Sequence, residues 1–165
     1  MENIVFFNKD FTGVDDKQYK KLGIRGRRAA DLAKMGLPIA PGFIIDADLT
    51  MKLPKVNVKQ LIKTFVDKIE KDMKKGYGDS DKPLLLKVVL SSDLNVPFFP
   101  SIHNVGLNDK VVTGFAKFTG EDFAWGEYRF LLRSIASKIY GIDEKELDEL
   151  EGKLPKNAKA KEYKE

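Results

Sequence analysis

The chain has 165 residues, of which 42% are hydrophobic and 33% charged, a composition typical of one soluble globular domain with its own core. It contains no cysteine, which excludes a disulfide framework, a thiolate zinc site and a cysteine nucleophile. The net charge of +4 is unevenly spread, because residues 17–28 are basic without any acid and residues 153–165 are rich in lysine. No secretory signal and no apolar run of roughly 20 residues is present, so we expect no membrane contact and a cytoplasmic location.

Short strands and helices alternate in the first 45 residues. Apolar residues at helical spacing predict a helix that ends at Gly36, which is followed by Pro38. In chain order we expect a strand at 4–7, a short helix at 16–22, a loop bracketed by Gly23 and Gly26, a helix at 27–35 and a strand at 43–45.

The central segment has the clearest helical pattern. Asn57 and Gln60 have the spacing of a capping box, and apolar residues recur every three or four positions after them. We expect this helix to continue until Gly76 ends it. The apolar run 84–90 predicts a buried strand, and the proline- and glycine-containing segment 91–107 predicts a long loop.

Helices dominate the C-terminal part. The patterns predict a helix at 109–118 that stops at Gly120, a long helix at 121–140, and a short helix that begins at Asp143 and ends near Glu151. The last residues offer little apolar surface to bury. We therefore predict one domain at 1–152 and a basic flexible tail at 153–165.

Four segments, in order, carry a resemblance to a known family. They are the opening strand IVFFNKD, the stretch RAADLAKMGLPIAPGF at 28–43, the segment 83–109 with PLLL, Pro97 and VGLND, and the segment 119–141 with its Thr-Gly, Phe-Ala, Tyr-Arg and Tyr-Gly pairs. Together they resemble the N-terminal nucleotide-binding region of pyruvate phosphate dikinase, and more weakly phosphoenolpyruvate synthase. The resemblance implies an α/β (α+β) fold, the N-terminal lobe of an ATP-grasp domain, with a small mixed or antiparallel sheet flanked by helices.

The chain departs from the family pattern where the resemblance implies phosphate contacts. The family's Gly-Gly-Lys loop is replaced by Gly26-Arg27-Arg28, so Arg28 keeps the charge while Arg27 replaces a glycine. The family's Ser-Val-Arg-Ser-Gly stretch is replaced by residues 87–91, with Val89 at the arginine position. Lys87 lies on the same side of the strand, about 7 Å away along it.

The same resemblance bears on metal and catalysis. The family's magnesium-binding acids, phosphohistidine domain and phosphoenolpyruvate/pyruvate barrel follow the matched region, so we expect a truncated and degenerate relative. We predict no catalytic residue and no metal ligand within the chain. ATP is the one cofactor that the resemblance suggests, with magnesium only where a partner chain supplies the acids. The candidate nucleotide- or phosphate-binding residues are Arg25, Arg27, Arg28 and Lys87.

Other residues have competing interpretations. The arginine cluster at a helix start indicates either an anion site or a solvated basic loop inherited from the family lysine. Phe98 and Phe99 either block the old pocket, dock a partner or pack under the loop. His103 has no companion ligands and is interpreted as structural, and Trp125 as a core residue rather than a base-stacking platform.

These observations favour a non-catalytic dikinase-like protein with an interaction or regulatory role and residual nucleotide or phosphate binding. One alternative is an ATP-binding subunit of a split phosphotransferase, completed by another chain. The other is an RNA- or ribosome-associated protein that binds through Arg25–Arg28 and the Lys-rich tail. A protein partner is expected, and we do not expect enzyme activity from the chain by itself.

Overall fold

The computed structural model describes residues 3–52, 55, 57–91 and 101–153. The chain divides into two compact units, one formed by Met1–Lys74 with Leu90–Phe99 and the other by Lys75–Val89 with Pro100–Glu165. Each unit is described by itself, and a single domain at 1–152 stays a prediction.

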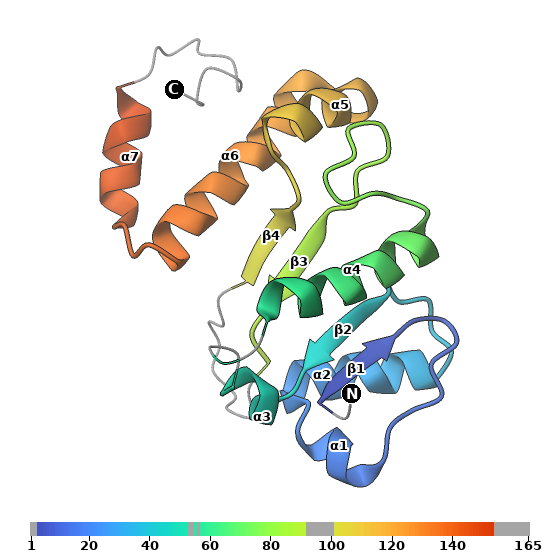
Figure 1. The fold of residues 1–165 in the computed structure, drawn as a ribbon. Helices are drawn as coiled ribbons and strands as arrows, with labels where there is room; N and C mark the ends of the chain where they lie inside the picture. Colours follow the sequence, from blue (N-terminus) through green and yellow to red (C-terminus); the bar gives the residue numbers. More distant parts are fainter. Residues whose placement is uncertain (1–2, 53–54, 56, 92–100, 154–165) are drawn as a thin grey trace. The chain divides into compact units, whose positions relative to one another are not determined.

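The first unit is a two-stranded sheet with helices (Figure 1). Its strands are antiparallel and pair from Ile4 opposite Ile45 to Phe7 opposite Gly42. In chain order its elements are β1 (Ile4–Phe7), α1 (Asp16–Lys20), α2 (Gly23–Lys34), β2 (Gly42–Ile45), α3 (Ala47–Thr50) and α4 (Val58–Met73).

Alternation of side chains along the strands gives this sheet two apolar faces. On one face Val5 packs with Leu22 and Ala30, the latter from α2. On the other face the ring of Phe43 lies 5.1 Å from the ring of Phe65, which comes from α4. The sheet is therefore held between α2 and α4 because neighbouring strand residues point to opposite sides.

The second unit combines a hairpin-like sheet with helices. Its elements are β3 (Leu86–Val89), β4 (Ser101–Val105), α5 (Asp109–Thr119), α6 (Glu121–Lys138) and α7 (Glu144–Gly152). The strands are antiparallel, with a register irregularity between Leu86 and Val88. Leu107, Val111 and Leu131 form the buried centre, and α6 packs against both α5 and β4.

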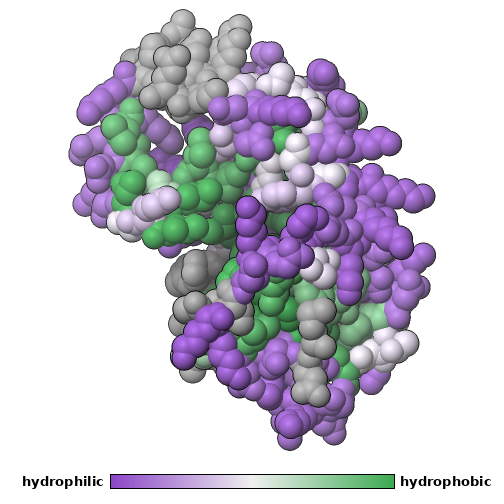
Figure 2. All heavy atoms as spheres, viewed as in Figure 1, coloured by the Kyte–Doolittle hydropathy of each residue, from purple (hydrophilic) through white to green (hydrophobic). Residues whose placement is uncertain are grey.

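Helix α7 is attached to α6 mainly through charge. Arg133 of α6 contacts Glu144 at 2.7 Å and Glu151 at 3.0 Å, and also pairs with Asp148. Hydrogen bonds to these carboxylates raise the pKa of Arg133. Helix α7 has no buried residue, and apolar surface shows over α6 and α7 in Figure 2.

The expected fold class is confirmed, since the described residues form an α+β structure with two small antiparallel sheets and helices. Asn57 caps α4 through its side chain, as the capping box predicts, and Gly120 ends α5. Within the described part of the chain, no helix is both long and apolar enough to cross a membrane.

Two predictions for the first unit were wrong in detail. The loop expected between Gly23 and Gly26 is the first turn of α2, because buried packing of Gly26 beside Leu22 and Ile44 overrides the weak helix propensity of glycine. Helix α4 ends at Met73 rather than at Gly76, because Lys74 takes the left-handed conformation at φ 52°.

Two predictions for the second unit were also wrong. The strand expected to be buried is short and largely exposed, with Val88 55% and Val89 38% exposed. The segment predicted as a long loop contains β4. The polar residues of β4 give no strand pattern in the sequence, and the strand forms because its backbone pairs with β3. Phe98, Phe99 and the tail from residue 154 lie outside the described residues.

A matched pair of glycines tests the packing of α5. A Cβ on Gly114 would lie 1.9 Å from the carbonyl oxygen of Ser80, whereas a Cβ on Gly126 of α6 would meet nothing within 4 Å. We expect Gly114→Ala to lower the free energy of unfolding by about 1–3 kcal/mol through overpacking. Gly126→Ala should raise it by about 0.5–1 kcal/mol through helix propensity. Urea denaturation followed by circular dichroism measures both, and equal effects would contradict the packing of α5.

Candidate anion-binding site

Helix α2 begins without a cap from its own N-cap side chain, because Leu22 occupies that position. Ser91, which lies more than 60 residues later in the sequence, contacts this helix start through its hydroxyl. Its Oγ accepts a hydrogen bond from the Gly26 N–H at 2.9 Å and donates one to the Leu22 carbonyl at 2.8 Å. The Gly26 N–H and the Leu22 carbonyl are the i and i−4 partners of the first turn of α2, so the Ser91 hydroxyl bridges the two ends of that turn.

Glycine at position 23 makes this approach sterically feasible. Gly23 has φ +66°, and a Cβ there would lie 2.6 Å from both the carbonyl oxygen and Oγ of Ser91. An L side chain would therefore be strained by its backbone and would also collide with Ser91. The start of α2 and Ser91 consequently form one closely packed structure.

The three predicted arginines lie together in the first two turns of α2, which has no acidic residue in its first turn. Arg28 is exposed, while Arg25 and Arg27 are half-buried. The Nη1 of Arg27 lies 3.5 Å from the Lys20 carbonyl oxygen, a long hydrogen bond. Cations near a helix N-terminus oppose the helix dipole, so an anion bound there would relieve an unfavourable arrangement.

A tyrosine and a carboxylate flank the arginines on their α1 side. The Tyr19 hydroxyl donates to Asp31 at 2.8 Å. This hydrogen bond is the main reason why the pKa of Tyr19 is raised, and the charge of Arg27 opposes the rise. The positive charge of this end of α2 is thus partly balanced by Asp31.

Lys87, the fourth predicted residue, is exposed on β3 of the second unit. The predicted set therefore falls into two groups, three arginines on α2 and one lysine on β3. Val89, also on β3, presents an apolar side chain at the position where the resemblance implies an arginine.

His103 lies on β4 of the second unit rather than in a loop. Its Nε2 is 3.1 Å from Ser101 Oγ, and its ring centroid is 6.0 Å from that of Phe130. Burial lowers the pKa of His103, and the charges of Lys87 and Lys138 lower it further, while Glu127 opposes them. Among the described residues no cluster of three or more His, Cys, Asp or Glu could hold a metal.

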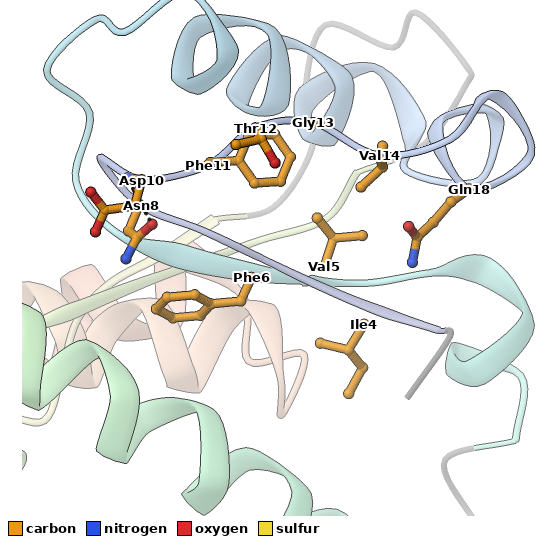
Figure 3. A pocket seen from close by; sticks show the side chains of 10 residues that line it. All are labelled: Ile4, Val5, Phe6, Asn8, Asp10, Phe11, Thr12, Gly13, Val14 and Gln18. Atoms are coloured by element: carbon orange, nitrogen blue, oxygen red, sulfur yellow. Dashed lines mark hydrogen bonds between the residues drawn. The ribbon is translucent and has the colours of Figure 1, made fainter.

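A cavity of about 310 Å³ lies beside β1 in the first unit (Figure 3). Core residues Val5, Phe11 and Val14 line it, and the chain turns over it through Asn8, whose Oδ1 accepts from the Asp10 N–H at 3.0 Å. Asp10 is the charged residue of the lining, and none of the four predicted residues contributes. A phosphate group would find no cation here, so this cavity does not suit it.

Comparison with known proteins gives consistent relatives, although no protein-family model matches the chain. The pyruvate, phosphate dikinase of Treponema pallidum (strain Nichols) is 39% identical over 125 residues, which is 76% of this chain and 14% of that protein. The chloroplastic enzyme of Mesembryanthemum crystallinum is 34% identical over 148 residues, covering 85% of this chain and 15% of the relative. The Entamoeba histolytica enzyme is 30% identical over 147 residues, covering 84% and 16%.

The chain is homologous to a segment of pyruvate, phosphate dikinase. It spans about 14–16% of the length of these dikinases, so their activity as whole proteins does not follow for this chain. The resemblance inferred from the sequence motifs is confirmed. Binding by Arg25, Arg27, Arg28 or Lys87 stays a prediction.

Ser91 is the site residue that sequence reasoning missed. The sequence contained one signal for it, because Ser91 occupies the position that corresponds to the glycine of the dikinase Ser-Val-Arg-Ser-Gly stretch. Its partner, the start of α2, is more than 60 residues away in sequence, with the hydrogen bond to Gly26 spanning 65 positions. Local spacing therefore could not show that the hydroxyl caps a helix.

Removal of the Ser91 hydroxyl tests this cap. We expect Ser91→Ala to lower the free energy of unfolding by about 1–2 kcal/mol, because the two hydrogen bonds of its hydroxyl to backbone groups are lost. Amide hydrogen exchange at Gly26 should accelerate more than exchange in α4. Thr12→Ala, in an exposed position of the same unit, is the control. Unchanged exchange at Gly26 in Ser91→Ala would show that the cap does not form in solution.

Proposed function

We propose that this chain is a non-catalytic dikinase-like protein that acts by binding, with a weak site for phosphate or nucleotide at the start of α2. The hydrogen bond from the Gly26 N–H to Ser91 Oγ carries the proposal. The resemblance implies that the phosphate-contacting loop of the dikinases corresponds to this helix start. In this chain the side chain of Ser91 is hydrogen-bonded to the first turn of α2, where a phosphate would approach.

Two further residues support the loss of phosphoryl transfer. Arg27 replaces a glycine of the dikinase loop, so a half-buried side chain stands where backbone would approach a phosphate. Val89 replaces the arginine of the second phosphate contact and cannot donate a hydrogen bond. Phosphoryl transfer depends on positioning and on charge stabilisation, so losing both contacts should remove most of the rate.

Weak anion binding is retained in this proposal through Arg28. Arg28 is exposed, and its side chain has no hydrogen bond or ion pair within the described residues. Arg25 lies three positions earlier and therefore on the same side of the helix. A pair of arginines beside a helix N-terminus suits the phosphates of ATP, with the first unit serving as part of an ATP-grasp-like lobe.

Protein partnership and a cytoplasmic location complete the proposal. The basic residues of α1 and α2 give the first unit a surface for an acidic partner, and Lys17, Lys20 and Arg28 among them are exposed. The absence of cysteine suits a reducing compartment.

Binding and hydrolysis measurements on the purified chain test this proposal. We expect no ATP hydrolysis above background, and weak ATP binding by thermal shift and calorimetry that weakens with salt. Arg28→Gln should reduce ATP affinity about fivefold, roughly 1 kcal/mol. Lys34→Gln, at the other end of the same helix, is the matched control and should leave the affinity unchanged.

Ser91→Gly provides the opposite change. It restores the residue of the dikinase pattern and removes the side chain that contacts the first turn of α2, so ATP affinity should rise while stability falls. Robust hydrolysis by the purified wild-type chain would refute the proposal. Activity that appears only with a co-purifying chain would favour a split phosphotransferase, and RNA binding lost in Arg28→Gln would favour a nucleic-acid role.

A further inference from the structure

Strand β4 places two polar side chains next to each other in the second unit. Ser101 and His103 are two residues apart and so lie on the same side of the strand. The 3.1 Å separation of Ser101 Oγ and His103 Nε2 brings an O–H group and an imidazole into direct contact. Both groups can donate to an oxyanion, the imidazole most strongly when protonated.

Two lysines from other elements approach the same place. Lys138 of α6 donates through Nζ to the Ser101 carbonyl at 3.0 Å, which leaves two further hydrogens on its ammonium group. Lys87 of β3 is exposed, and its charge acts on His103 together with that of Lys138. Strand β3 and helix α6 thus each contribute one cation beside β4.

The one carboxylate that opposes these lysines at His103 is already engaged. Glu127 of α6 accepts a hydrogen bond from the Asn104 side chain, and its charge acts on His103 against the lysines. Among the described groups that act on the imidazole, two cations therefore face one hydrogen-bonded anion. Phe130 of α6 contacts the imidazole ring edge-on, with the two ring centroids 6.0 Å apart.

We propose that Ser101, His103, Lys87 and Lys138 form a binding site for a phosphate group, carried either by inorganic phosphate or by a small phosphate ester. All four residues belong to the second unit, whereas the arginines of α2 belong to the first. The site combines a hydroxyl donor, an imidazole donor and two ammonium groups, a donor set that suits a tetrahedral oxyanion. Only Lys87 is shared with the residues considered for nucleotide binding, so this inference does not depend on the function proposed for α2.

Binding should be coupled to protonation of His103. In the unliganded chain, burial and the lysine charges hold the imidazole neutral to lower pH than usual. A bound phosphate supplies negative charge, which favours the protonated ring and raises the pKa of His103. By reciprocity, the affinity for a phosphate group of fixed charge should fall as pH rises through the pKa of His103, about tenfold for each unit by which phosphate raises it.

The experiment uses the fact that the chain contains one histidine. The ring resonances of His103 are followed by NMR across pH in chloride buffer, and again with inorganic phosphate or ATP at equal ionic strength. We expect a saturable rise of the His103 pKa with inorganic phosphate. If ATP raises it at lower concentration, the favoured source is a nucleotide. Identical titrations in chloride, phosphate and ATP would overturn the proposal.

Variants separate this site from a general effect of charge. Lys138→Gln and Lys87→Gln should each reduce the phosphate-induced rise of the His103 pKa. Lys87 is exposed, so its variant should fold as the unaltered chain does. Lys117→Gln, on the exposed side of α5, is the matched control and should keep the full rise. Arg28→Gln should keep it as well, since Arg28 belongs to the other unit. Equal loss in Lys117→Gln would show non-specific screening and would overturn the proposal.

Discussion

The hydroxyl of Ser91 fixes the start of α2, and much of the first unit depends on that helix. It accepts from the Gly26 N–H and donates to the Leu22 carbonyl, so it bridges the i and i−4 partners of the first helical turn beside the buried Leu22. Leu22 and Ala30 then meet Val5 from the sheet. The same helix carries three arginines, so one hydrogen-bonded side chain positions both the core contact and the basic surface.

Sequence patterns were sufficient wherever a structure is set by nearby residues. Asn57 caps α4, Gly120 ends α5, and apolar spacing places both long helices, because these features depend on neighbours within a few positions. Strand β4 was missed for the opposite reason. Its Ser101, His103 and Asn104 have no strand-like pattern, and the strand exists because the backbone of β3 pairs with it.

The candidate site shows the same division. Motif spacing was enough to find the arginines of α2 and the homology to a dikinase segment. It could not show that Ser91 hydrogen-bonds to the start of α2, or that Lys138 lies near the site on β4. These contacts join residues far apart in sequence, and the hydrogen bond from Lys138 to Ser101 spans 37 positions. Chemistry that depends on such pairs becomes visible only when the fold is known.

Two different interactions hold the second unit together, apolar packing at its centre and ion pairs at helix α7. The centre around Val111 and Leu131 is held by apolar burial, which salt does not weaken. Helix α7 instead depends on charge: the guanidinium of Arg133 is shared by three carboxylates, and Arg129 contacts one of them, Glu151, at 4.0 Å. Salt screens these attractions. A rise in ionic strength should therefore weaken the attachment of α7 to α6, while the apolar centre of the unit remains intact.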